Sequence, residues 1–179
     1  MSLVYISLGS NIGDGRANLV KAWRLLGTAK SITTLALSVP YITKPIIKAE
    51  WEKKGQEVSE NLFTNAVGVL ETSLDPRALL KTTSDIENKL GRDRDQTVNR
   101  TIDLDLIYYD DLILSDEHLT LPHPEMHKRH FVLTPLSDLA PDRIHPANGK
   151  STMNMLRDLP YAEKDEICKA QWETPEDSK

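Results

Sequence analysis

The segment of residues 101–109 constrains the fold of this chain more than any other stretch. Apolar and polar residues alternate along it, a period of two that is typical of a strand with one buried face. The apolar side consists of Ile102, Leu104, Leu106 and Tyr108. Asp103 and Asp105 occupy the other side, so their side chains point to the same face, about 6–7 Å apart. The sequence therefore predicts a sheet strand that packs on one face and carries two carboxylates on the other.

Two aspartates on one strand face need an explanation. Asp is disfavoured in strands, and like charges on one face repel each other. A hydrated face would account for polar residues, but Thr or Lys would serve it better than two carboxylates. One or two divalent cations at Asp103 and Asp105 would resolve the repulsion. We therefore favour a metal site at these two residues over a merely solvated strand face.

A polar loop with three arginines, Arg92, Arg94 and Arg100, precedes this strand. Charged loops are usually hydrated surface, and Asp93 and Asp95 could neutralise this one. Planar guanidinium groups nevertheless match the geometry of phosphate oxygens, and a loop can close over a ligand. The loop alone leaves both interpretations open. Beside a metal pair, it indicates a ligand that carries phosphate.

Composition bounds the class of protein. The chain has 179 residues, of which 39% are hydrophobic and 27% charged. This length and composition are typical of one ordinary globular domain. The net charge of −5 argues against a general nucleic-acid or membrane-surface binder, which relies on excess Lys and Arg. No apolar run has the length of a membrane span, and residues 3–8 are too short for a signal-peptide core. Cys168 is the single cysteine, so no disulfide framework exists and we expect a cytoplasmic protein.

Periodicity and turn signals predict the element order β-α-β-β-α-β. Strands are expected at residues 3–8, 32–43, 62–72 and 101–109, and a further short strand at 112–114 would form a hairpin. Helices are expected after Asp14 or Asn11, between Asp75-Pro76 and Gly91, and at residues 131–139, where Pro135 limits the start. This order predicts an α+β fold with a ferredoxin-like βαββαβ core, an added hairpin and C-terminal helices. Residues 1–146 would form a single domain and residues 147–179 a peripheral tail.

Other stretches gain meaning only in combination. Phe63 and Asn65 share a strand face and would suit a flat heterocycle, although a core Phe beside a satisfied Asn is the better interpretation in isolation. His123 lies in a histidine-rich stretch whose spacing matches no trusted zinc site, so contacts to nucleotide phosphates are an equal or better interpretation. Residues 9–13 lack the pattern of a phosphate-binding loop. Residues 44–60 are long for a structureless connection and are either a mobile functional loop or partly helical.

Five stretches in order carry a specific resemblance. They are Tyr5-Ile6-Ser7-Leu8-Gly9-Ser10-Asn11, Phe63-Thr64-Asn65-Ala66-Val67 with Leu70-Glu71-Thr72, Ile86-Glu87 with Gly91-Arg92, Arg100-Thr101-Ile102-Asp103-Leu104-Asp105, and Leu121-Pro122-His123-Pro124 through Arg129-His130-Phe131-Val132-Leu133. Together they resemble the 6-hydroxymethyl-7,8-dihydropterin pyrophosphokinases of folate biosynthesis, over residues 4–146. The resemblance implies transfer of pyrophosphate from ATP to the hydroxymethyl group of the pterin, with release of AMP.

The same resemblance implies roles for individual residues. Two Mg²⁺ would lie between Asp103, Asp105 and the phosphates of ATP, the co-substrate, and Arg92 and Arg100 would complete the catalytic set. The pterin would contact Thr43, Pro45, Ile46, Phe63, Asn65 and Phe131. ATP would contact Glu87, Arg94, Leu106, Thr120, His123 and Arg129. We expect a monomer whose partners are these small molecules, with no nucleic acid and no membrane.

Three departures from the family and three rival functions bear on this assignment. Residues 49–60 are unusually charged, and the residues past 146 have no counterpart in the family. Val98-Asn99-Arg100 stands where the family often has Trp-Gly-Pro-Arg, and Thr43-Lys44-Pro45 replaces Thr-Pro-Pro. A non-catalytic ferredoxin-like module that binds a pterin or nucleotide would not need both aspartates and both arginines. A metal-dependent phosphohydrolase would not need an aromatic clamp. An RNA-recognition module fits poorly with the acidic net charge.

Overall fold

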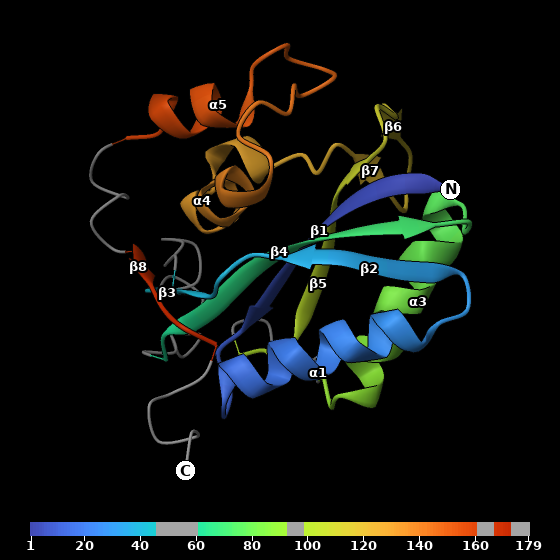
Figure 1. Ribbon diagram of the computed structural model, residues 1–179, viewed down its shortest axis with the longest axis vertical. Helices are drawn as coiled ribbons and strands as arrows, with labels where there is room; N and C mark the ends of the chain where they lie inside the picture. The colour runs from blue at the N-terminus through green and yellow to red at the C-terminus, as the bar shows by residue number, and fades with distance from the viewer. Residues whose placement is uncertain (46–60, 93–98, 161–166, 173–179) are drawn as a thin grey trace.

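The sheet at the centre of the molecule determines where every other element lies. The computed structural model describes residues 1–45, 61–92, 99–160 and 167–172. Helices α1 and α3 pack against one face of a six-stranded sheet, and α4 lies on the opposite face with α5 behind it (Figure 1). The predicted α+β class is therefore confirmed.

The sheet contains β1 (Ser2–Ser10), β2 (Ile32–Leu37), β3 (Tyr41–Thr43), β4 (Phe63–Thr72), β5 (Asp103–Tyr109) and β8 (Ile167–Lys169). Its strand order is β5-β1-β4-β3-β8, β2 also pairs with β4, and all these pairings are antiparallel. The helices are α1 (Gly15–Thr28), α3 (Pro76–Lys89), α4 (His130–Leu139) and α5 (Thr152–Asp158), with a 3-10 turn at Met126–Lys128. Two short strands, β6 (Leu114–Ser115) and β7 (Thr120–Leu121), pair with each other outside the sheet.

The start signals of two helices act as predicted. The Asp14 side chain caps α1 by accepting a hydrogen bond from the Ala17 N–H at 3.0 Å. Asp75 caps α3 by accepting from the N–H groups of Arg77 and Ala78, and a proline occupies the first turn. Each carboxylate satisfies N–H groups that have no partner inside the helix.

Three local predictions were wrong. The strand expected at residues 32–43 is two strands, because the chain bends at Ser38, whose N–H donates to the Val67 carbonyl and whose hydroxyl accepts from the Val67 N–H. The strand expected at residues 112–114 begins only at Leu114 and pairs with β7. Pro135 does not limit the start of α4 but lies inside it.

Two hydrophobic cores lie on the two faces of the sheet. Because successive side chains of a strand point to opposite faces, β1 directs Val4, Ile6 and Leu8 into the core beneath α1 and α3. Tyr5 points into the second core, which α4 covers. The face under α4 therefore has to accommodate both a core and any polar side chains that β1 and its neighbours direct there.

Helix α5, in the C-terminal region, contacts this second core. Helix α5 packs against α4, and Met155 and Leu159 are buried there. The strand β8 joins the sheet beside β3. The expected boundary at residue 146 remains a prediction. In the described ranges, none of the helices is long and apolar enough to cross a membrane.

Gly68 of β4 provides a test of the packing between the sheet and α1. A Cβ atom at Gly68 would lie 2.3 Å from the Trp23 ring, which α1 places directly over the strand. We expect Gly68→Ala to lower the free energy of unfolding by about 1–3 kcal/mol, because the ring would have to move. Chemical denaturation measures the loss. In a Trp23→Leu background the same substitution should cost less; an equal cost in both backgrounds would contradict this packing.

Candidate active site

The candidate site lies where the end of β1 meets the beginnings of β4 and β5 (Figure 1). The register aligns four residues in one row across the sheet: Asp103, Gly9, Asn65 and Tyr41. Residues in such a row share a face, here the face of α4, because the Tyr41 hydroxyl donates to Asp138 of that helix at 2.8 Å. Asp105 and Phe63, each two residues along its strand, point to the same face. The register thus places the two carboxylates beside the predicted pterin residues.

Gly9 makes room for Asn65 in this row. A Cβ atom at Gly9 would come within 3.2 Å of the Asn65 Oδ1. The Asn65 side chain is buried, and its Nδ2 donates to the Thr43 Oγ1 at 2.9 Å. The amide is therefore held in one orientation before any ligand arrives.

Two arginines contact the carboxylate of Asp103. Arg92 Nη1 lies 2.8 Å from Asp103 Oδ1, and Arg100 Nη1 pairs with Asp103 Oδ2. The Asp103 side chain is only 16% exposed, so these ion pairs are partly shielded from water. The two guanidinium groups and the carboxylate form one charged cluster at the start of β5.

Glu87 anchors this cluster from below the sheet. It is 3% exposed, and its Oε1 accepts a hydrogen bond from the Leu104 N–H at 2.8 Å and contacts Arg92 Nη1. Leu104 lies between Asp103 and Asp105, so one carboxylate fixes both the strand that carries the aspartates and an arginine. Burial raises the pKa of Glu87, while the Leu104 N–H and the Arg92 charge favour its anion.

The end of α3 brings Arg92 to this position. Gly91 adopts a positive φ of 83°, and the N–H groups of Gly91 and Arg92 donate to the carbonyls of Asn88 and Glu87 at 3.1 and 3.0 Å. This is a Schellman motif, which ends a helix with a sharp turn. The predicted helix stop at Gly91 is therefore also what directs Arg92 back toward Glu87.

Asn11 fixes Arg100 and was not identified as a site residue from the sequence. Its N–H donates to the Arg100 carbonyl at 3.0 Å, and its Oδ1 accepts from the Arg100 N–H at 2.6 Å. Its Nδ2 also donates to Asn99 Oδ1 at 3.1 Å. Asn11 looked like a turn or cap residue, and its place at the end of the first matched stretch was the only signal for this role.

His123 lies next to Asp105, with its Nε2 3.9 Å from Asp105 Oδ2. Burial and the charge of Arg129 lower the pKa of His123 to about 4, so the ring is neutral at pH 7. Its Nδ1 accepts from the Glu125 N–H at 3.1 Å, which leaves the ring proton on Nε2, toward Asp105. Burial and the neighbouring Asp103 raise the pKa of Asp105.

The remaining predicted site residues differ in where the structure places them. Arg129 precedes α4, with its guanidinium carbon 5.6 Å from the centre of the Phe131 ring, and Thr120 lies on β7. Pro45 lies two residues after the end of β3. The Leu106 side chain is buried in the core beneath α1 and α3, which leaves only its backbone on the side of the site. Ile46 and Arg94 lie outside the described residues.

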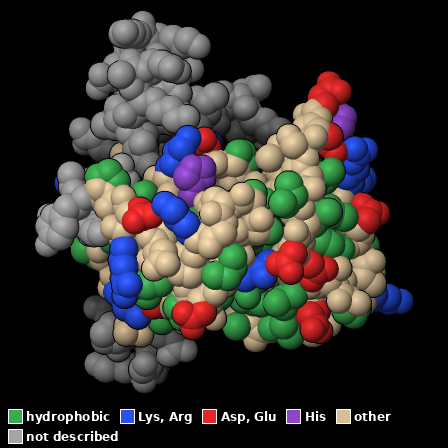
Figure 2. Space-filling model, turned by 90° about the horizontal axis from the view of Figure 1, so that it is seen from above, with side chains coloured by type: hydrophobic (Ala, Val, Ile, Leu, Met, Phe, Trp, Pro, Cys, Tyr) green, Lys and Arg blue, Asp and Glu red, His purple; other side chains and the backbone are tan. Residues whose placement is uncertain are grey.

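No continuous basic surface is visible on the face shown in Figure 2, where acidic and basic side chains are interspersed. Among the residues that the structure describes, no group of three or more His, Cys, Asp or Glu could by itself hold a metal ion. Two carboxylates on one strand face, paired with two arginines and in a row with a fixed amide, are instead features typical of phosphoryl-transfer sites, which bind polyphosphates together with divalent metals.

Comparison with known proteins supports this class and names the family. Residues 5–141 match the profile of 7,8-dihydro-6-hydroxymethylpterin-pyrophosphokinase (HPPK). The chain therefore belongs to the HPPK family.

Relatives differ in length. A 2-amino-4-hydroxy-6-hydroxymethyldihydropteridine pyrophosphokinase of Methylorubrum extorquens is 38% identical over 145 residues, which cover 80% of this chain and 86% of that protein. The Bacillus subtilis protein of the same name is 38% identical over 77% of this chain and 78% of its own length. The folic acid synthesis protein FOL1 of Dictyostelium discoideum is 36% identical over 89% of this chain, which spans only 23% of that protein.

Solved structures share the fold. A Plasmodium falciparum HPPK-DHPS with pterin and p-hydroxybenzoate superposes with a TM-score of 0.69 at 15% identity, over 94% of this chain and 47% of that one. An HPPK-DHPS in complex with substrates gives a TM-score of 0.65 at 15% identity, over 92% and 44%. At this identity the likeness concerns the fold alone.

The role of Glu87 as an anchor is testable on stability. We expect Glu87→Ala to lower the free energy of unfolding by about 3 kcal/mol, because it leaves a buried N–H and a partly buried arginine without this acceptor. Asp85→Ala, two residues before Glu87 on the same helix, removes an exposed carboxylate paired with Lys81. It should lower the free energy of unfolding by at most about 0.5 kcal/mol. Urea denaturation of both variants measures the difference. Similar losses in the two would contradict the anchor.

Proposed function

We propose that this chain transfers the pyrophosphoryl group of ATP to the hydroxymethyl oxygen of 6-hydroxymethyl-7,8-dihydropterin. The oxygen–phosphorus bond forms at the β-phosphorus, the bond from that phosphorus to the α,β-bridging oxygen breaks, AMP leaves, and the hydroxyl proton passes to solvent. The observation that carries this proposal is the common sheet face of Asp103, Asp105, Asn65 and Phe63, in a chain of the HPPK family. We assign no general base.

The donor set at Asp103 and Asp105 fits Mg²⁺. Carboxylate oxygens are the hard ligands that this ion prefers, and it usually takes one or two of them together with substrate phosphates and water. When bound, Mg²⁺ neutralises phosphate charge and makes the hydroxyl a better nucleophile. Burial and the like charge of Asp103 raise the pKa of Asp105, and a cation held by both carboxylates would offset their repulsion. We propose two ions, as in the resemblance.

Arg92 and Arg100 would exchange partners when ATP binds. Both now contact Asp103, and phosphate oxygens are equally suitable partners for a guanidinium group. Arginines that contact the transferred group stabilise charge that develops in the transition state. Asn11 and Glu87 keep both side chains close enough for that exchange. Arg92, Arg100, Asp103 and Asp105 are thus the proposed catalytic residues.

The pterin would lie toward β3 and α4. Phe63 and Phe131 would stack on the ring, and the amide of Asn65, held by Thr43, would bind its edge. Pro45 and Ile46 remain proposed pterin contacts. On the ATP side we propose Thr120, the neutral His123, Arg129 and Arg94. The position of Glu87 supports positioning rather than direct contact, and Leu106 can offer only its backbone.

We also propose that the sheet and its helices form a ferredoxin-like core. The strand order β5-β1-β4-β3 with α1 and α3 on one face supports a ferredoxin-like core. We also propose that the chain acts as a monomer on small molecules. A non-catalytic binding module of the same fold remains the alternative.

Product analysis tests the proposed reaction. With ATP, Mg²⁺ and the pterin, we expect AMP and a pterin that carries two additional phosphates, detected by chromatography and mass spectrometry. Release of ADP or inorganic phosphate would favour a phosphohydrolase or another kinase. Tight binding of both substrates without turnover would favour the binding module.

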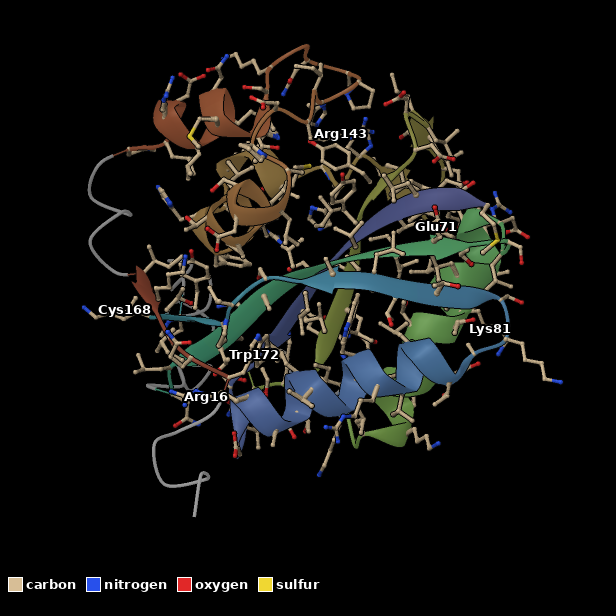
Figure 3. The ribbon with its side chains drawn as sticks, in the orientation of Figure 1. Arg16, Glu71, Lys81, Arg143, Cys168 and Trp172 are labelled. Atoms are coloured by element: carbon tan, nitrogen blue, oxygen red, sulfur yellow. The ribbon has the colours of Figure 1, made fainter. Side chains whose placement is uncertain are left out.

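Substitution of the aspartates tests the metal site. Asp103→Asn and Asp105→Asn should each lower kcat by about 10³-fold, because charge stabilisation of the transferring group is lost while the fold persists. Glu71→Gln is the matched control, since Glu71 lies on β4 at the other end of the sheet (Figure 3). Activity near that of the control in both aspartate variants would overturn the assignment.

A further inference from the structure

A C-terminal segment, Ile167–Trp172, lies along the sheet edge beside β3, the strand that carries Thr43 (Figures 1 and 3). Its strand β8 pairs with β3 in the register Tyr41–Lys169, Ile42–Cys168 and Thr43–Ile167. Among the described residues, β8 is the element that pairs with this edge of the three-residue strand β3. We call residues 167–172 the strap.

The first anchor of the strap joins β3 to α4. Lys169 Nζ lies 3.4 Å from Asp138 Oδ1 and 5.8 Å from the centre of the Tyr41 ring. The Tyr41 hydroxyl donates to the other oxygen of Asp138 at 2.8 Å. Asp138 lies about two turns from Phe131 on the same helix. The strap, β3 and the helix of a proposed pterin-stacking ring therefore meet at one carboxylate.

The second anchor holds the chain that enters β3. The Trp172 Nε1 donates to the Ser38 carbonyl at 3.1 Å, and its ring packs partly buried against the core beneath α1. The Ala170 N–H donates to the Pro40 carbonyl at 2.8 Å. Ser38 also hydrogen-bonds to Val67 of β4. The start of β3 is thus fixed between the strap and the next strand.

We propose that the strap is a positioning segment for the pterin subsite. It pairs with the backbone of Thr43, whose hydroxyl fixes the Asn65 amide, so it keeps that hydrogen bond in place before the pterin arrives. This inference rests on the proposed function and adds the element that orders the acceptor subsite.

The sheet order predicts a selective effect. The strap and the aspartates lie on opposite edges, because β4 and β1 separate β3 from β5. Without the strap, the bound pterin would have to order β3 itself, and this would weaken pterin binding. The residues proposed to bind ATP would still be held by Glu87 and Asn11.

Two truncations test the proposal in the otherwise intact protein. A chain that ends at Pro160 lacks the strap, and a chain that ends at Trp172 keeps it and serves as the matched control. We expect the pterin KM of the shorter chain to rise about tenfold, with the ATP KM and kcat at saturating pterin within about twofold of the control. A general loss of stability, seen as a lower melting temperature, would not raise the pterin KM while leaving the ATP KM and kcat unchanged.

Point variants decide the question if the shorter chain does not fold. Trp172→Leu and Lys169→Met remove one anchor each and should raise the pterin KM severalfold, whereas Lys150→Met, which removes an exposed pair with Asp158, should not. An unchanged pterin KM, or a loss confined to kcat, would overturn the strap while AMP formation still upholds the proposed function. Failure of the full chain to form AMP would instead overturn the function itself.

Discussion

The arrangement of the site depends on one buried carboxylate. Glu87 accepts the backbone N–H between the two aspartates and pairs with Arg92, so a helix end, a strand and an arginine share one anion. An isolated buried carboxylate would be costly, and here its partners offset that cost. As a consequence, the part of β5 that carries Asp103 and Asp105 is fixed relative to the end of α3, and Arg92 is kept beside Asp103.

The two groups of candidate site residues lie on opposite sides of β1 in the sheet. Carboxylates and arginines cluster at β5, whereas the amide, the aromatic rings and the strap gather around β3 and α4. Gly9 lies between the two groups in the central row, where any side chain would press on Asn65. The two substrates of a pyrophosphokinase would meet above Gly9, with the hydroxymethyl group of the pterin facing the phosphates of ATP.

Local patterns predicted much of this arrangement. The alternation on β5 predicted the shared face of its aspartates, and Asp14, Asp75 and Gly91 marked helix ends through their own side chains or backbone freedom. Contacts between distant segments were not predictable in this way. The pairing of β8 with β3 and the bonds from Asn11 to Arg100 depend on register set by the whole sheet.

The proposed reaction requires that its divalent metal binds at Asp103 and Asp105. The most direct measurement is a crystal structure of the protein with Mn²⁺, a non-hydrolysable ATP analogue and the pterin, with anomalous scattering recorded to locate the metal. We expect anomalous peaks in contact with both carboxylates and with phosphate oxygens, and guanidinium groups of Arg92 and Arg100 turned from Asp103 to the phosphates. Anomalous peaks elsewhere, with both arginines still paired to Asp103, would contradict it.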